Sequence, residues 1–235
     1  MKRIAYSVIL CLFFFITLSA QKLTNDDLYI TYGNSLYVKS IANMQLVTEK
    51  EYNEQLKHKV NFLNTKSIIL KKQGKLTLPC SNEKSVTYAD NMSENENHAE
   101  YKYIGQIDFL NVYVIAYTFW ESSGYLFVDK SNGEELDSFE EFPHIAKDRT
   151  NMVVLKQDPY EMSANIAFYK IEDREFTPVV SDNFEYWVPY SEKPIFWSNN
   201  NSLYIPAIHV DAYNSGKELA PLCQYIKVSI IDIKY

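Results

Sequence analysis

Four oxygen-bearing residues, Asp129, Ser131, Asn132 and Glu134, fall within six consecutive positions and could gather around a hard cation. In an EF-hand calcium loop the glycine occupies position six. Here Gly133 occupies position five when Asp129 is counted as position one. Asn132-Gly133 is instead a preferred pair for a type I′ turn, because both central residues of that turn need a positive φ. Strand-like runs flank the pair, so the sequence predicts a β-hairpin with Asp129 and Ser131 solvated. It predicts no metal site here.

The four histidines, His58, His98, His144 and His209, lack the two-turn spacing of a zinc-binding helix, and the chain has no Cys-x-x-Cys pair. His209 and Asp211 would share one face of a strand and could hold a metal or orient a general base. The alternative is a surface histidine beside an exposed aspartate at a strand end. We favour that alternative, because a real site needs several further partners.

Other catalytic patterns are missing from the sequence. There is no Gly-x-Ser-x-Gly motif and no glycine-rich phosphate loop. The carboxylate pairs Glu134-Glu135 and Glu140-Glu141 are strand neighbours, so their side chains would point to opposite sides of a sheet. We therefore expect no catalytic residues, no cofactor and no enzymatic activity.

The tryptophans are the remaining candidates for ligand contact. Trp120-Glu121 and Tyr186-Trp187 pair an aromatic ring with a polar neighbour, a combination that can stack on a sugar or anchor a protein partner. The alternative is that tryptophans fill the core between sheets, as expected for Trp197.

Cys80 and Cys223 are the two cysteines that follow the N-terminal segment. A disulfide between them is one possibility in an oxidising compartment, and two separate buried thiols are the other. The sequence leaves both open.

The first twenty residues predict export. Lys2 and Arg3 precede the apolar run Ile4–Leu18, and the small residues Ser19 and Ala20 follow it, which is the pattern of a cleaved signal peptide. We expect residues 1–20 to be this peptide and residues 21–235 to form a single secreted β domain in the periplasm or outside the cell. No later segment reaches membrane-spanning length. Cleavage would move the net charge from −7 to −9, which disfavours nucleic acid and anionic lipid as partners.

Aromatic residues make up 15% of the chain and alternate with polar residues over short runs, which is the period-two pattern of β-strands. The predicted strands are Leu28–Tyr32, Ser35–Ser40, Lys75–Leu78, Val86–Ala89, Tyr101–Ile107, Val112–Phe119, Tyr125–Lys130, Glu134–Phe139, Met152–Lys156, Asn165–Ile171, Ser202–Ile208 and Gln224–Ile231. One short helix is predicted within Val47–Lys59, where Thr48 and Glu51 form a capping box and Val47 and Tyr52 a hydrophobic staple. The pattern indicates a mostly antiparallel all-β protein.

Two segments, FPHIAKDRTNMVVL and FWSNNNSLYI, lie some fifty residues apart. Both resemble the repeat of WD40-like and TolB-type β-propellers, in which a Pro or Trp precedes a Ser-Pro-Asp-Gly turn and a strand. The resemblance covers about Gly124 to Ile208. It implies a propeller-like stack that is incomplete or has four or five blades, with a binding face made of loops. A β-sandwich or an irregular barrel is the alternative fold.

These observations favour an exported, non-enzymatic β protein that binds a partner protein or a glycan through loops. A small glycan-directed hydrolase using loop carboxylates is the alternative, with the tryptophans as sugar platforms.

Overall fold

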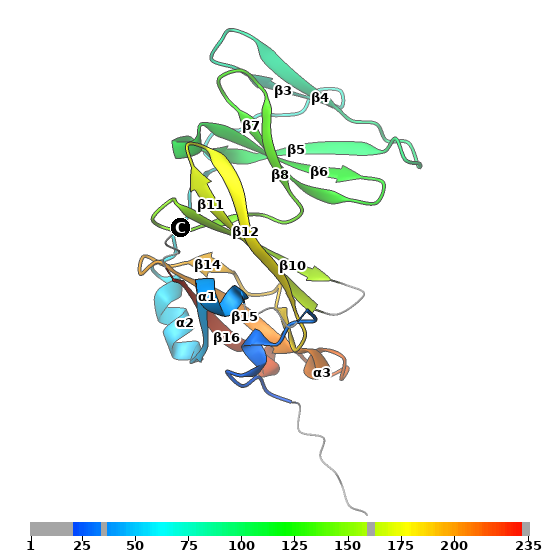
Figure 1. The fold of residues 1–235 in the computed structure, drawn as a ribbon. Coiled ribbons are helices and arrows are strands. Elements are labelled where there is room, and N and C mark those ends of the chain that lie inside the picture. Colours follow the sequence, from blue (N-terminus) through cyan, green and yellow to red (C-terminus); the bar gives the residue numbers. More distant parts are fainter. Residues whose placement is uncertain (1–20, 34–36, 159–162, 232–235) are drawn as a thin grey trace, which may run out of the picture.

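The computed structural model describes residues 21–33, 37–158 and 163–231, so the predicted signal peptide lies outside the described residues. The predicted all-β class is confirmed: antiparallel strands dominate, and the helices are short. Three larger sheets and a separate hairpin make up the fold (Figure 1).

The first sheet has the strand order β2-β5-β6-β7-β8, formed by Leu63–Asn64, Ala99–Ile107, Val112–Phe119, Ser123–Asp129 and Glu135–Phe139. The middle sheet has the order β12-β11-β10-β9, formed by Glu175–Phe184, Ser163–Glu172, Asn151–Asp158 and His144–Ile145. The last sheet has the order β1-β16-β15-β13, formed by Ala42–Val47, Gln224–Ile230, Ser202–His209 and Trp187–Pro189. A fifth strand, β14 (Phe196–Trp197), also pairs with β15. The separate hairpin pairs β3, Lys75–Pro79, with β4, Ser85–Ala89.

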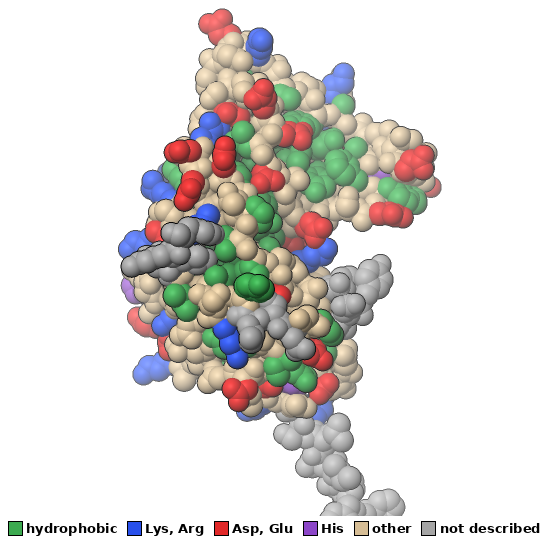
Figure 2. Space-filling model, in the orientation of Figure 1, with side chains coloured by type: hydrophobic (Ala, Val, Ile, Leu, Met, Phe, Trp, Pro, Cys, Tyr) green, Lys and Arg blue, Asp and Glu red, His purple; other side chains and the backbone are tan. Residues whose placement is uncertain are grey.

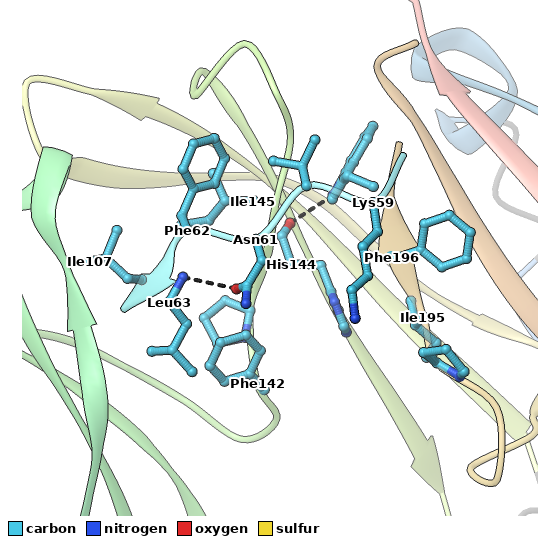
Figure 3. A pocket seen from close by; sticks show the side chains of 14 residues that line it. Lys59, Asn61, Phe62, Leu63, Ile107, Phe142, His144, Ile145, Ile195 and Phe196 are labelled. Carbon is cyan, nitrogen blue, oxygen red and sulfur yellow. Dashed lines mark hydrogen bonds between the residues drawn. The ribbon is translucent and has the colours of Figure 1, made fainter. Parts of the chain in front are cut away.

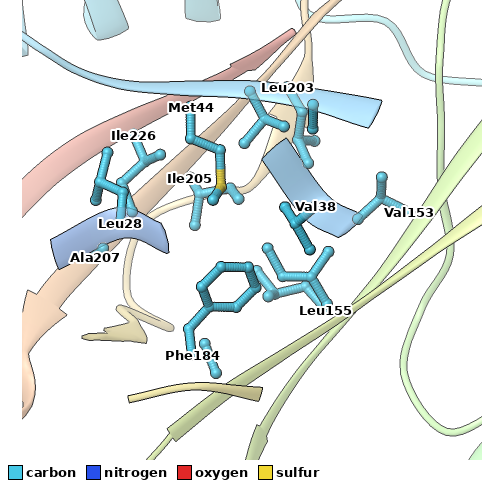
Figure 4. Close-up of a cluster of buried hydrophobic side chains, with 14 of the residues drawn as sticks. Leu28, Val38, Met44, Val153, Leu155, Phe184, Leu203, Ile205, Ala207 and Ile226 are labelled. Atoms are coloured by element: carbon cyan, nitrogen blue, oxygen red, sulfur yellow. The ribbon is translucent and has the colours of Figure 1, made fainter. Parts of the chain in front are cut away.

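These layers stack one on the next through a series of hydrophobic clusters. The hairpin β3–β4 packs on one face of the first sheet, and the opposite face of that sheet shares a core with the middle sheet. The middle and last sheets enclose the largest cluster, which also takes in the N-terminal segment (Figure 4). The stack is open: the described residues form no closed barrel or propeller.

Strand β6 shows why the sequence folds this way. Val112 and Val114 face the middle sheet, whereas Tyr113 and Ile115 face the hairpin. Because successive side chains of a strand point to opposite faces, a strand buried on both sides reads as a continuous apolar run.

The predicted helix is confirmed as α2, Glu49–Leu56. The Oγ1 atom of Thr48 accepts a hydrogen bond from the backbone N–H of Glu51 at 3.1 Å, and Tyr52 packs in one cluster with Val47. Two further short helices, α1 (Tyr37–Ile41) and α3 (Val210–Tyr213), correct the expectation of only one. Within the described ranges, no helix is long and apolar enough to cross a bilayer.

Two predicted strands near the N-terminus are wrong. Leu28–Tyr32 overlaps a 3₁₀ helix at Asp27–Tyr29, and the Asp27 carboxylate accepts from the backbone N–H of Thr24 at 2.6 Å. The described part of Ser35–Ser40 lies in α1, where Val38 and Ile41 bury the same side of one helical turn. Alternation over so few residues did not distinguish a strand from a single turn of helix.

Candidate functional site

A pocket of about 230 Å³ opens where the first, middle and last sheets converge (Figure 3). We call it the three-sheet pocket. Its walls are mostly aliphatic and aromatic, with polar contributions from three residues. The lining consists of Lys59, Val60, Asn61, Phe62, Leu63, Ile107, Phe142, Pro143, His144, Ile145, Pro194, Ile195, Phe196 and Trp197.

One wall is a connecting segment that crosses from the last sheet to the first. The backbone N–H of Val60 donates to the Trp197 carbonyl at 2.7 Å, which holds the start of the segment against β14. Leu63 pairs with Ile107 in the first sheet, which holds its end. The Asn61 Oδ1 atom accepts from the backbone N–H of Leu63 at 2.9 Å and so fixes the bend between these anchors.

His144 is held in the opposite wall by the short strand β9. Its backbone pairs with Val153, and its carbonyl accepts a hydrogen bond from Trp197 Nε1 at 2.9 Å. The imidazole lines the pocket and is densely surrounded by protein. Desolvation lowers its pKa to about 4, so the ring is neutral at pH 7. Its ring nitrogens form no hydrogen bond within the described part of the chain.

Lys59 supplies the charge of the three-sheet pocket. It is exposed, and it forms no ion pair with any described residue. The described lining contains no carboxylate, hydroxyl or thiol, so Lys59, Asn61 and His144 supply its polar side chains. This arrangement can hold an apolar body and attract an anionic group to its mouth.

The residues predicted as ligand contacts do not come together. Trp120 and Glu121 lie exposed in the turn between β6 and β7, and Trp120 keeps 52% of its surface accessible. Tyr186 is half-buried beside the last sheet. Trp187 is fully buried against Phe184, with ring centroids 5.2 Å apart, so it presents no exposed ring. Trp197 fills core, as expected, and also lines the three-sheet pocket, whereas Trp120 is the one of the three that lies exposed.

Asp129 is not the solvated turn residue that the sequence predicted. It is buried, its Oδ1 accepts from the backbone N–H of Ser131 at 2.7 Å, and its Oδ2 lies 2.7 Å from Nη2 of Arg174. The Arg174 contact is an ion pair between the two sheets. Burial raises the pKa of the Asp129 carboxyl, but the Ser131 N–H and Arg174 outweigh burial and hold the pKa below its usual value.

The turn itself also differs from the prediction. Gly133 has φ +82°, but Asn132 is not among the described residues with positive φ, so the turn is not type I′. A Cβ atom on Gly133 would lie 2.9 Å from Val86, because the turn packs on the β3–β4 hairpin. No group of three or more His, Cys, Asp or Glu side chains suited to a metal occurs within residues 21–33, 37–158 and 163–231.

Cys80 and Cys223 are free thiols at separate places, and Cys80 is buried whereas Cys223 is half-buried. Cys80 is buried beside the β7–β8 turn, whereas Cys223 packs near Tyr190 and Tyr225 at the far side of the last sheet. His209 caps α3: its Nδ1 accepts from the backbone N–H of Asp211 at 3.1 Å, and the ring is buried. This cap explains the His209–Asp211 pair structurally.

Sequence reasoning missed the three-sheet pocket. His144 and Lys59 are 85 positions apart in the numbering and share no motif, so only the packing of the sheets brings them to one cavity. No family model, no curated protein and no solved structure matches the chain.

Proposed function

We propose that the protein is an exported, non-enzymatic binding protein whose three-sheet pocket holds an apolar ligand carrying a carboxylate. The observation that supports this proposal most directly is the composition of the pocket. In a chain with net charge −7, its described lining pairs one unpaired lysine with an apolar interior and includes no acidic residue.

Each polar group of the pocket has a role in this proposal. The apolar walls would bury the body of the ligand, which is the main source of favourable free energy. Lys59 would attract the carboxylate at the mouth. The neutral imidazole of His144 would offer one donor and one acceptor deeper in the pocket.

The volume limits the ligand to a small acid or to a single terminal residue. A pocket of about 230 Å³ accommodates one aromatic or branched side chain with its carboxylate. A free aryl acid and the C-terminal residue of a partner protein have this same chemistry. The second source agrees with the expectation of a protein partner.

Calorimetric titration of the purified protein tests the ligand class. The probes are 4-phenylbutanoate, the neutral 4-phenylbutanamide and the cationic 4-phenylbutylamine. We expect the acid to bind most tightly and the amine most weakly. Equal affinities for all three, or no binding, would overturn the proposal. A peptide ending in Phe, compared in its free-acid and amidated forms, then distinguishes a chain end from a free acid.

Lys59→Gln provides the variant for the same titration. An exposed ion pair contributes at most about 1 kcal/mol, so we expect about fivefold weaker binding of the acid. Affinity for the neutral amide should not change. Lys50→Gln is the matched control, because Lys50 is an exposed lysine of α2 that does not line the pocket. Identical losses in both variants would argue against a role for Lys59.

A further inference from the structure

The hairpin β3–β4 covers only part of the outer face of the first sheet. Along β6, Tyr113 and Ile115 are buried under this layer, whereas Tyr117 and Phe119 on the same face are half-buried. Since residues two apart in a strand share a face, one strip of apolar side chains runs from beneath the hairpin into the open. Its aromatic end is left without a covering layer by the described residues.

The uncovered end forms a shallow groove of about 490 Å³, which we call the tyrosine groove. Its lining consists of Tyr101, Tyr117, Phe119, Leu126, Glu135, Leu136, Asp137 and Ser138. The aromatic rings contact one another: centroids lie 4.7 Å apart for Tyr117 and Phe119, and 5.9 Å apart for Tyr101 and Phe119. Trp120 and Glu121 follow Phe119 directly in the exposed turn.

The charged residues that line the groove are all acidic. Glu135 and Asp137 line the groove, and its described lining contains no lysine or arginine. Glu135 is the carboxylate next to the rings, and its Oε1 accepts from the Tyr88 hydroxyl at 3.0 Å. Asp137 lines the groove from β8, where its register partner Phe127 belongs to the core shared with the middle sheet. Asp137 forms no ion pair with the described residues, and its Oδ1 accepts from the backbone N–H of Ser138 at 2.7 Å. On the face drawn in Figure 2, hydrophobic side chains gather over the first sheet with acidic side chains around them.

We propose that the tyrosine groove docks a lysine- or arginine-bearing peptide segment of a partner protein. A cation over an aromatic face is attracted by the ring quadrupole, and a neighbouring carboxylate adds to that attraction. Arginine can make both the ring contact and the carboxylate contact, because its planar guanidinium stacks on aromatic rings and pairs with carboxylates. The rings meet at tilted and edge-on angles, so they offer no flat platform for a stacked sugar, and the charge of Glu135 is matched by a cation.

Matched peptides test the proposal in the intact protein. The probe is a fluorescein-labelled peptide with four Gly-Arg repeats, and its counterpart carries citrulline, a neutral isostere, in place of each arginine. Fluorescence anisotropy should show binding of the arginine peptide that weakens with salt, and about tenfold weaker binding of the citrulline peptide. Equal binding of the two peptides would overturn the proposal, as would binding of chitohexaose or cellohexaose without binding of the arginine peptide.

Isosteric variants locate the site. The double variant Glu135→Gln/Asp137→Asn removes two charges and keeps the shape of both side chains. The amide oxygen that replaces the Glu135 carboxylate can still accept the hydrogen bond from the Tyr88 hydroxyl. We expect this double variant to bind the arginine peptide about fivefold more weakly. Asp26→Asn/Glu218→Gln removes the same charge from exposed positions outside the groove and should leave binding unchanged. Equal effects of the two double variants would mean that the peptide responds only to net charge.

Discussion

Two polar regions lie where the first sheet meets the middle sheet, and they use their polar groups differently. In the Asp129–Arg174 link, the carboxylate receives a backbone N–H and a guanidinium, and Arg174 Nε donates to the Leu110 carbonyl at 2.8 Å. In the three-sheet pocket, the imidazole of His144 and the ammonium of Lys59 have no such partners among the described residues. Paired groups hold layers together, whereas unpaired groups beside a cavity remain available to a ligand.

The link also carries backbone strain. Asp173 and Arg174 are the two central residues of the β11–β12 turn, with φ +48° and +72°. Such angles are rare for residues other than glycine and asparagine and cost on the order of 1 kcal/mol each. The contacts of Arg174 to the first sheet offset this cost, because the turn geometry aims its side chain across the interface.

Asp129→Ala should give the largest effect. It leaves the Ser131 N–H and part of the Arg174 guanidinium without their acceptor, and we expect the free energy of unfolding to fall by about 3 kcal/mol. Urea unfolding at neutral pH measures the loss. Affinity for 4-phenylbutanoate should stay unchanged, because Asp129 does not line the three-sheet pocket.

Asp26→Ala is the control for this substitution, since Asp26 is exposed and should change stability by less than about 0.5 kcal/mol. A double-mutant cycle with Arg174→Ala isolates the pair, and we expect a coupling of about 1 kcal/mol because Arg174 is partly exposed. Additive losses would show that the two side chains act independently.

His144 should make the protein sensitive to mild acid. Its pKa of about 4 in the fold lies below the value of about 6.5 expected in the unfolded chain. The unfolded state therefore takes up the proton first as the pH falls. The stability associated with the neutral ring is fully present above pH 6.5 and is lost as the pH falls toward 4. The shift corresponds to at most about 3 kcal/mol.

His144→Gln should remove this dependence. Between pH 7 and about 4.5 we expect the wild type to lose about 2 kcal/mol more of its unfolding free energy than the variant. Urea unfolding at several pH values measures both curves. His58→Gln is the control, because His58 is exposed and lies outside the pocket. Parallel curves for wild type and His144→Gln would show that the ring is solvated enough to titrate normally.

The strands were predictable because burial of one face makes apolar and polar side chains alternate along a strand, and burial of both faces makes a continuous apolar run. The strands from β5 to β8 agree with the predicted segments to within a few residues. Strand β12 was missed because its turn reads Asp173-Arg174, without the Gly or Asn that normally marks such a turn. Asn132-Gly133 carries that mark but forms a different turn, because packing on the β3–β4 hairpin decides its backbone geometry.

The candidate sites were less predictable than the fold. Trp120 and Trp187 each follow an aromatic residue in the sequence, yet Trp187 is core and Trp120 is exposed. The stacking of the layers determines which faces are covered. The tyrosine groove could have been noticed from Tyr113, Tyr117 and Phe119, three aromatic residues that share one face of β6. Where the hairpin ends on that strand depends on contacts that no local pattern contains.

The Asp129–Arg174 link makes one smaller prediction, which concerns the strain in its turn. Asparagine adopts positive φ more readily than aspartate, so Asp173→Asn should relieve part of the strain at φ +48°. Arg174 and its contacts to the first sheet stay in place. We expect the free energy of unfolding to rise by about 0.5 kcal/mol, which replicate urea unfolding curves can resolve.

Asp173→Asn also removes a negative charge close to Glu172 and Glu175, and this alone could stabilise an acidic protein. Asp26→Asn makes the same change in net charge at an exposed position without positive φ, so the difference between the two variants reports the turn. If the gain is equal in both, relief of like-charge repulsion explains it. If Asp173→Asn destabilises the fold, the Asp173 carboxylate itself helps to position Arg174, and the link extends one residue further than its direct contacts show.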